Sequence, residues 1–295
     1  NGKIGAIISI EEYNNSDRYI VLIDGKKVSL YPEQIRPANL ENEALNYTAK
    51  DINSLFTARL LLNPNINSLY SLNSSKIDYI PYQFRPVLKI IKSESPRILI
   101  ADGVGVGKTI EAGLILKELE ARFDMKSVLV ICPRPLITER KWQNELKDKF
   151  GEKFVHIDGE KLRYCVKEAY LEEEWPDDYA KCIIPYSLFD EAIVCGTAEN
   201  GLKKLNKKSF VDLNPFPKFD LVIIDEAHHI KNPNTYAYQA VQMFCENAAS
   251  IVMLTATPIQ LGDKDLFVLL HLLRPDLIYD YESFEHMSEP NPYIN

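Results

Sequence analysis

The chain lacks a positive charge balance, a metal-binding cysteine pattern and any long apolar run. Its formal net charge of −8 and its pI of about 5.3 exclude a globally basic footprint for nucleic acid, so any such contact must be local. Its five cysteines include no Cys-x-x-Cys pair, which favours reduced cysteines in a cytoplasmic protein. No apolar stretch approaches ~18 residues and the first residues have no signal-peptide pattern, so we expect no membrane span.

A glycine-rich segment lies between an apolar run and a helix-like stretch. Residues 102–109 read Asp-Gly-Val-Gly-Val-Gly-Lys-Thr, after the strand-like run 97–101 and before the helix-like stretch 110–119. A loop of this kind brings backbone N–H groups close to phosphate oxygens, and the start of the helix adds the positive end of its dipole. The segment therefore predicts a site for a nucleotide triphosphate.

Each residue type in this loop suits phosphate binding. Gly103, Gly105 and Gly107 allow backbone conformations that are closed to other residues. Lys108 supplies a cation for the outer phosphates, and the Thr109 hydroxyl can bind Mg²⁺. The loop therefore predicts that the nucleotide triphosphate binds together with Mg²⁺.

The strict loop pattern begins with glycine, and this chain has Asp102 at that position, so a second motif must decide. That motif lies where the apolar run 219–224 ends in Asp-Glu-Ala-His-His. Ligand-binding residues gather at the carboxyl ends of buried parallel strands, which places these acids beside the loop. Asp225 can hold the Mg²⁺, and Glu226 can orient and deprotonate the attacking water. Together the two motifs predict hydrolysis of a nucleotide triphosphate.

The neighbouring histidines His228 and His229 raise the question of a zinc site. A zinc protease helix needs His-Glu-x-x-His, which puts both histidines on one helical face, whereas sequence neighbours point in different directions. The spacing therefore disfavours zinc.

With these motifs in this order, the chain resembles helicase superfamily two, with residues 225–228 as its DEAH-type box. Residues 255–260 read Thr-Ala-Thr-Pro-Ile-Gln and are similar to the third motif of that family. The resemblance implies that Thr255, Thr257 and His228 couple the ATP site to nucleic-acid contacts.

An upstream segment is similar to the adenine-recognition element of the same family. Residues 80–86 read Ile-Pro-Tyr-Gln-Phe-Arg-Pro. The resemblance implies that Gln83 reads the edge of the base, with Tyr82 close enough to stack nearby.

Further features favour the branch of Swi/Snf-related double-stranded DNA translocases. That branch usually has Asp-Glu-x-Gly-x-Gly-Lys-Thr, so Asp102 is normal for it, while Gly103 replaces the glutamate of the family. The run 109–116 most resembles the bacterial RapA-type subgroup. Residues 261–275 end at a proline and predict a helix with one apolar face formed by Leu266, Leu269, Leu270 and Leu273.

The strand-like run 128–133 and the residues after it resemble motif Ia of the family, a loop that contacts the DNA backbone. The resemblance implies that Pro133 and Arg134 contact nucleic acid, positioning the motor without reading sequence. Arg140 and Lys141 are further candidates, although each of these three cations taken singly is equally well explained as a solvated surface residue.

Trp142 lies in the helix-like stretch that follows, residues 136–145, and we expect it to pack in the core and not to stack on bases. Residues 183–187 match a further motif of the family only loosely.

Strand-like runs near residues 97, 128, 154, 181, 220 and 250 alternate with helical stretches. This alternation predicts an α/β fold with a RecA-like parallel sheet flanked by helices. We expect the RecA-like ATP-binding lobe to span residues 77–280, with a tail at 281–295 leading toward a second lobe.

The start of the chain has a different character. Short β-rich runs at 4–10, 19–23 and 27–31, with an Asp-Gly hairpin signal at 24–25, predict a small SH3/Tudor-like β-barrel over residues 1–38. Such a barrel could contact the motor, DNA or a protein partner, or could cap the motor without a ligand. Residues 39–76 have helix-like spacing and predict a helical connector.

The resemblance also implies a second RecA-like lobe, whose arginines stabilise the transferring phosphate. Because the chain ends at Asn295, we expect that lobe to lie outside it, and the chain alone to bind ATP weakly and hydrolyse it poorly. The leading hypothesis is the ATP-binding lobe of an ATP-dependent double-stranded DNA translocase. The alternatives are a strand-separating DNA or RNA helicase, a restriction-type motor, and a recruitment protein with a degenerate nucleotide site.

Overall fold

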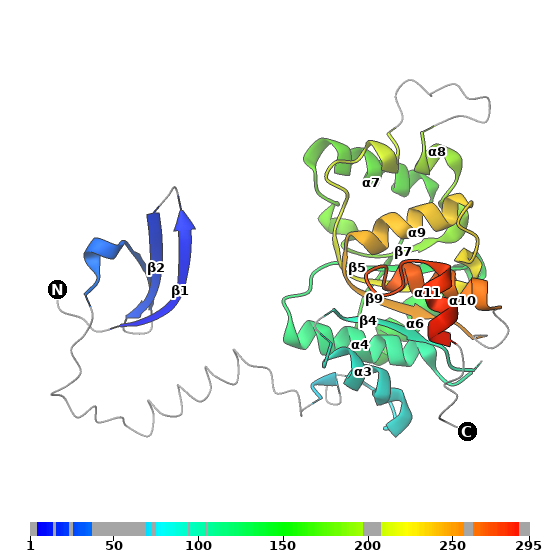
Figure 1. Cartoon of the computed structure of the whole chain (residues 1–295), viewed down its shortest axis with the longest axis horizontal. Coiled ribbons are helices and arrows are strands. Elements are labelled where there is room, and N and C mark those ends of the chain that lie inside the picture. Colours follow the sequence, from blue (N-terminus) through cyan, green and yellow to red (C-terminus); the bar gives the residue numbers. More distant parts are fainter. Residues whose placement is uncertain are drawn as a thin grey trace. The chain divides into compact units, whose positions relative to one another are not determined.

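A computed structural model describes residues 5–13, 16–23, 26–36, 69–71, 75–93, 95–103, 105–196, 208–256 and 262–288. The chain divides into two compact units, Asn1–Asn63 and Pro64–Asn295 (Figure 1). The predicted helical connector at residues 39–76 lies largely outside the described residues, as does the end of the predicted tail at 289–295. Among the residues that the structure describes, none of the helices is long and apolar enough to cross a membrane.

The N-terminal unit contains a three-stranded antiparallel sheet in the order β1-β2-β3. Its strands are β1 (Ala6–Tyr13), β2 (Ser16–Ile23) and β3 (Lys26–Leu30), followed by a short 3₁₀ helix, η1 (Pro32–Gln34). Ile23 pairs with Lys26, so two residues connect β2 to β3 at the predicted hairpin. The sheet fits the small β domain predicted for this part of the chain.

The second unit is built on a six-stranded parallel sheet in the order β4-β9-β8-β5-β7-β6, which confirms the predicted RecA-like α/β architecture. Each strand-like run of the sequence forms one of its strands: β4 (Arg97–Ile100), β5 (Val128–Cys132), β6 (Val155–His156), β7 (Lys181–Pro185), β8 (Phe219–Ile224) and β9 (Ala248–Leu254). The strands are rich in valine and isoleucine because both faces of the sheet are buried.

Helices cover both faces of this sheet (Figure 1). The α-helices are α3 (Arg85–Ile90), α4 (Lys108–Arg122), α5 (Arg134–Thr138), α6 (Lys141–Phe150), α7 (Gly159–Glu172), α8 (Glu191–Val194), α9 (Tyr236–Glu246), α10 (Asp263–Leu273) and α11 (Tyr281–Ser288). The 3₁₀ helices are η2 (Pro81–Phe84), η3 (Asp177–Tyr179), η4 (Tyr186–Leu188), η5 (Phe210–Asp212) and η6 (Ala227–Ile230).

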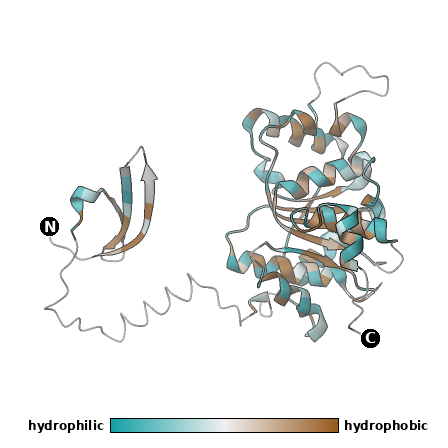
Figure 2. Cartoon of the chain, in the orientation of Figure 1, coloured by the Kyte–Doolittle hydropathy of each residue, from teal (hydrophilic) through white to brown (hydrophobic). Residues whose placement is uncertain are grey.

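Two apolar clusters hold the layers together, one on each face of the sheet. Val128 and Val130 of β5 pack with residues of α3, α4 and α6, whereas Leu129 and Ile131 pack with residues of α7, α9 and α10. This alternation along one strand is the period of two that a pleated strand requires. Figure 2 shows the apolar residues running along the strands between the helices.

Two helical predictions differ in detail from the structure. In α10 the buried leucines are Leu269, Leu272 and Leu273, while Leu266 and Leu270 are only half-buried. The apolar face is therefore rotated toward Leu272, because α10 packs on several elements at once, β4, η6, α9 and α11. The residues after β5 form α5 where a loop was predicted, and a break at Arg140 separates α5 from α6.

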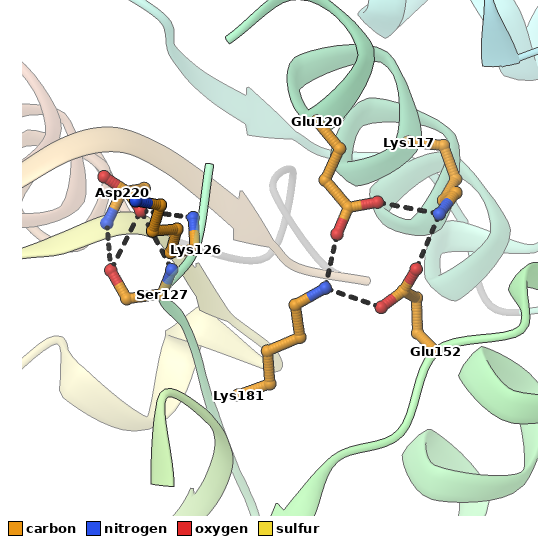
Figure 3. A network of polar contacts seen from close by, with 7 residues as sticks. All are labelled: Lys117, Glu120, Lys126, Ser127, Glu152, Lys181 and Asp220. Atoms are coloured by element: carbon orange, nitrogen blue, oxygen red, sulfur yellow. Dashed lines mark hydrogen bonds and ion pairs between the residues drawn. The ribbon is translucent and has the colours of Figure 1, made fainter. Parts of the chain in front are cut away.

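Polar side chains tie the amino-terminal edge of the sheet together (Figure 3). Lys181, the first residue of β7, contacts Glu120 of α4 and Glu152 from the loop after α6, and Lys117 contacts the same two glutamates. Nearby, Asp220 of β8 accepts hydrogen bonds from the backbone and hydroxyl of Ser127, before β5. These contacts fix the strand starts and leave the opposite edge to the loops that carry the predicted motifs.

Candidate nucleotide-binding site

The carboxyl ends of four strands bring the predicted motifs to one edge of the sheet. Ile100 pairs with Leu254, Ile131 with Ile224, and Ile224 with Met253, so the residues that follow these strands are neighbours. The phosphate loop follows β4, Pro133 follows β5, Asp225 follows β8 and Thr255 follows β9.

The phosphate loop uses two of its glycines for backbone conformation. Gly105 and Gly107 have φ angles of +83° and +94°, which glycine adopts without the steric cost that a side chain brings. A Cβ atom at Gly107 would also lie 2.5 Å from Nε2 of Gln83. Gly103 lies outside the positive-φ region and a Cβ there would meet nothing within 4 Å, so the backbone does not require glycine at this position.

Lys108 lies at the first turn of α4 and closes the loop on itself. Its ammonium Nζ donates hydrogen bonds to the carbonyl oxygens of Asp102 and Gly103, at 2.9 and 2.8 Å. Thr109 follows and is buried at the helix start. A cation and a helix N-terminus thus converge where the outer phosphates of a nucleotide would lie.

Gln83 and Tyr82 lie beside the same loop. The amide nitrogen of Gln83 and the hydroxyl of Tyr82 donate to the carbonyl oxygen of Val106, at 3.0 and 2.7 Å. A cavity of about 570 Å³ opens here, lined among others by Ile80, Tyr82, Gln83 and residues 105–107. The cavity places Gln83 where a planar base bound beside the phosphate loop could be read by hydrogen bonds.

Asp225 is almost fully buried at the end of β8, and both of its carboxylate oxygens are held. Oδ1 accepts from the backbone N–H of Glu226 at 2.9 Å, and Oδ2 accepts from the indole N–H of Trp142 at 2.8 Å. The pKa of Asp225 is raised above its ordinary value, chiefly by burial. The hydrogen bond from Trp142 lowers this pKa, whereas the charge of Glu226 adds to the increase. An oriented carboxylate is suited to hold Mg²⁺, whose own charge would keep it ionised.

Glu226 has a left-handed backbone, with φ 50° and ψ 52°. Non-glycine residues in this region carry strain that surrounding structure must hold, and such residues cluster at functional sites. The carboxylate oxygen Oε2 lies 3.3 Å from Nδ1 of His228, and the rings of His228 and His229 lie 4.5 Å apart. Burial lowers the pKa of His229, and the neighbouring His228 adds to this effect.

Buried polar atoms at this edge are poorly satisfied among the described residues: Oγ1 of Thr255 has no hydrogen-bond partner, and Oε2 of Glu226 and Nδ1 of His228 have only their 3.3 Å contact with each other. Buried polar atoms are normally satisfied, so this concentration fits a site completed by a ligand, water or an ion. With the glycine cradle and the Lys108 ammonium, the residues present fit a magnesium nucleotide. Thr257, predicted to share the coupling role, lies outside the described residues.

Sequence reasoning missed two features of the site. It predicted Trp142 as a packing residue, and its complete burial confirms that, but gave no sign of the hydrogen bond to Asp225. It also missed Glu111, a fully buried carboxyl in the first turn of α4. Burial, reinforced by the charge of Asp102, raises the pKa of Glu111 to about 8. No local pattern signals either feature, because both depend on residues brought together by the fold.

A second cavity, of about 340 Å³, lies at the carboxyl ends of β5, β6 and β7. We call it the basic pocket, and its polar lining is Arg134, Thr138, Arg140, His156, Asp158 and Ser187. Arg134 and Arg140 are exposed, and Pro133 immediately precedes the start of α5. The structure thus brings Arg134 together with Arg140, whereas the third candidate cation of the segment, Lys141, does not line the pocket.

Comparison with known proteins gives consistent results. A family model described as SNF2-related domain matches residues 41–291, beginning inside the predicted connector. The Sulfolobus solfataricus SWI2/SNF2 ATPase core in complex with dsDNA is similar, with a TM-score of 0.54 and 21% identity over 75% of this chain. The Sulfolobus solfataricus SWI2/SNF2 ATPase core domain gives a TM-score of 0.52 and 21% identity over 75% of this chain. The chain covers 40% and 39% of those two chains, about two fifths of their length.

Proposed function

Because the chain belongs to the SNF2-related domain family, we propose that it is the ATP-binding lobe of an ATP-dependent motor acting on double-stranded DNA. One observation carries the proposal: the phosphate loop with Lys108, and the pair Asp225–Glu226 with its buried, oriented carboxylate, follow strands that end at the same edge of the sheet. That set of groups suits phosphoryl transfer to water.

In this proposal Lys108 neutralises the outer phosphates of ATP, while Thr109 and Asp225 hold the magnesium ion. Bound Mg²⁺ supplies charge neutralisation at the phosphate oxygens. Glu226 orients the attacking water and accepts its proton, which is the role of a general base. Gln83 donates or accepts at the base edge, and His228, Thr255 and Thr257 link the ATP site to the nucleic acid.

The chain alone is proposed to bind ATP weakly and to hydrolyse it slowly. It spans about two fifths of the SWI2/SNF2 cores that it resembles. Arginines contributed from outside a nucleotide site stabilise the transferring phosphate by a factor on the order of a thousand or more. A second RecA-like lobe would supply them here.

Duplex DNA is proposed to contact Pro133 and the basic pocket next to it, where Arg134 and Arg140 lie. The net charge of −8 requires such contacts to be local, and this pocket gathers two exposed arginines with two hydroxyls. One structure of similar fold is, by its title, a SWI2/SNF2 core in complex with dsDNA. The first motif also differs from the Gly-x-Thr-Gly-x-Gly-Lys usual in DEAH-type RNA helicases, which favours duplex DNA over RNA.

Three finer assignments belong to the same proposal. The run 109–116 favours the bacterial RapA-type subgroup, and the five free cysteines favour a cytoplasmic protein. The predicted boundaries, with a SH3/Tudor-like barrel at 1–38, a connector at 39–76 and the ATP-binding lobe at 77–280, leave the N-terminal unit available for a protein partner.

ATP hydrolysis by the natural protein at its full length, with duplex DNA, single-stranded DNA or RNA, tests the proposal. We expect duplex DNA to stimulate turnover most, and Lys108→Ala or Glu226→Gln to reduce it by roughly a hundredfold or more. The matched controls Lys126→Ala and Glu282→Gln change exposed residues away from the site and should retain activity.

Other outcomes would favour the alternatives. Stimulation by single strands or RNA but not by duplex DNA would indicate a strand-separating helicase. If the protein hydrolyses ATP with none of these nucleic acids, or if its biological function survives Lys108→Ala, a recruitment protein would be indicated.

A further inference from the structure

Two aromatic side chains from different elements hold Asp225 in place. The indole N–H of Trp142, in α6, donates to Oδ2 at 2.8 Å, and the hydroxyl of Tyr186, in η4, donates to the backbone carbonyl oxygen of Asp225 at 2.8 Å. Trp142 is fully buried, and the ring of Tyr186 lies 5.8 Å from that of His229. The backbone and the side chain of Asp225 are thus fixed separately.

Each of these aromatics belongs to a segment that borders the basic pocket. Arg140, Pro185 and Ser187 line the pocket. Trp142 comes two residues after Arg140, and Tyr186 lies between Pro185 and Ser187 in the sequence. The segment with Arg140 therefore also carries Trp142, which donates to the carboxylate of Asp225. The segment with Pro185 and Ser187 carries Tyr186, which donates to the carbonyl oxygen of Asp225.

The connection through Arg140 is short and has an unusual backbone. Arg140 has φ 52° and ψ 28°, a left-handed conformation that non-glycine residues rarely adopt, and α6 begins at the next residue. The backbone of this turn is held by the hydrogen bonds of Arg140 N–H to Ile137 and of Asn144 N–H to Arg140, so a phosphate bound at the Arg140 guanidinium would act on the turn that positions Trp142.

The two oxygens of Asp225 leave little freedom for the carboxylate to turn. Oδ1 is held by the N–H of Glu226 and Oδ2 by Trp142, and each oxygen keeps a further lone pair for a metal ion. Loss of the indole N–H would release one oxygen and leave a buried acceptor unpaired.

We propose that Trp142 and Tyr186 are positioning residues that transmit phosphate binding in the basic pocket to Asp225, and so couple duplex DNA to magnesium-nucleotide binding. The inference rests on the proposed function and deepens it. We call this connection from the basic pocket through Trp142 and Tyr186 to Asp225 the relay. It is separate from the predicted third motif at Thr255 and Thr257, since it reaches Asp225 from the side of β5 and β7.

The test is the affinity of the full-length natural protein for a fluorescent ATP analogue with Mg²⁺, measured with and without a saturating DNA duplex. Coupling appears as a ratio of the two affinities, and linkage requires the analogue to change duplex affinity by the same factor. In Trp142→Phe and Tyr186→Phe we expect this ratio to fall toward one, by about three- to tenfold, as the loss of one hydrogen bond to a buried acceptor implies. The Mg²⁺ concentration needed for half-saturation should rise in Trp142→Phe.

Matched controls separate this role from simple packing. Trp175→Phe removes an indole N–H that donates to the Tyr179 carbonyl at 3.1 Å, and Tyr238→Phe changes a buried tyrosine of α9. Both should keep the wild-type ratio. A purely structural role would lower the melting temperature and both affinities together without changing their ratio.

The outcomes distinguish this inference from the proposed function. If the natural protein shows coupling and both Trp142→Phe and Tyr186→Phe keep the wild-type ratio, the relay is wrong while the motor remains supported. If the natural protein binds duplex DNA and nucleotide without any coupling, the relay also fails. If it binds no duplex DNA or no nucleotide, the proposed function fails with it.

Discussion

Two buried glutamates on α4 differ in the charges around them. Burial, followed by the charge of Asp102 and a hydrogen bond with it, raises the pKa of Glu111 from 4.5 to about 8, with Lys108 opposing. Glu118, equally buried, accepts two hydrogen bonds from Arg122 and one from the backbone N–H of Ser71. The first carboxyl favours its protonated form, whereas the second is paired with the guanidinium of Arg122.

Because of this difference, we expect removal of the charge to change the free energy of unfolding in opposite directions at Glu111 and Glu118. Between pH 4.5 and about 8 the folded chain keeps a proton on Glu111 that the unfolded chain loses, so this group lowers the free energy of unfolding as pH rises. Glu111→Gln should therefore raise that free energy by on the order of 1–3 kcal/mol at about pH 8, and change it little at about pH 5. Urea denaturation at both pH values measures it.

Glu118→Gln is the matched control on the same helix. It takes one charge from a buried ion pair, so we expect a loss of about 2–4 kcal/mol at both pH values. A Glu111→Gln variant whose unfolding free energy falls with pH as steeply as the parent's would contradict the assignment.

At the scale of single residues the sequence predicted those whose role follows from a local motif. Lys108 and Thr109 are tied to a glycine loop, and Asp225 and Glu226 to the end of a buried strand, so the residue types and the strand rule placed them at one edge. The hydrogen bond from Trp142 to Asp225 joins residues 83 positions apart, and no local spacing encodes it.

At the scale of elements, an ion-pair network joins α4, the loop after α6 and the start of β7 (Figure 3). Lys117 and Lys181 each contact both Glu120 and Glu152, so the charges alternate around the group. Burial alone would raise the pKa of Glu152, but the hydrogen bonds and charges of Lys117 and Lys181 together hold it below its ordinary value. The group is partly shielded from water, and pairs of this kind contribute more than exposed ones.

The lowered pKa of Glu152 predicts a stabilisation that is present above the unfolded pKa and is lost as pH falls through the folded one. Glu152→Gln should cost about 1–2 kcal/mol of unfolding free energy near pH 7, and this cost should shrink toward about pH 3. Asp124→Asn, which breaks an exposed ion pair with Lys126, should have no measurable effect. A cost independent of pH would show that the carboxylate charge is not what stabilises the network.

The helices and strands were predictable where a continuous apolar pattern in the sequence marks them. All six strands of the parallel sheet occur where valine- and isoleucine-rich runs predicted them. The break between α5 and α6 was not predictable, because an arginine in a left-handed conformation has no sequence signal. The rotated face of α10 was not predictable either, since packing on β4, η6, α9 and α11 together decides which leucines are buried.

At the scale of the whole molecule, charge and architecture have to be considered together. A chain of net charge −8 has no general attraction for DNA, yet its sheet edge presents a basic pocket beside the nucleotide site. Membership of the SNF2-related family gives this arrangement a function that the fold alone would not, since similar sheets serve many chemistries. We propose that this lobe belongs to a motor that moves along duplex DNA without separating its strands.

The most direct test is displacement of a third DNA strand from a triplex by the natural protein at its full length, with the underlying duplex monitored in the same reaction. We expect ATP-dependent displacement of the third strand while the duplex stays intact, and loss of displacement in Glu226→Gln. Separation of the duplex strands, or displacement that continues without ATP hydrolysis, would contradict it.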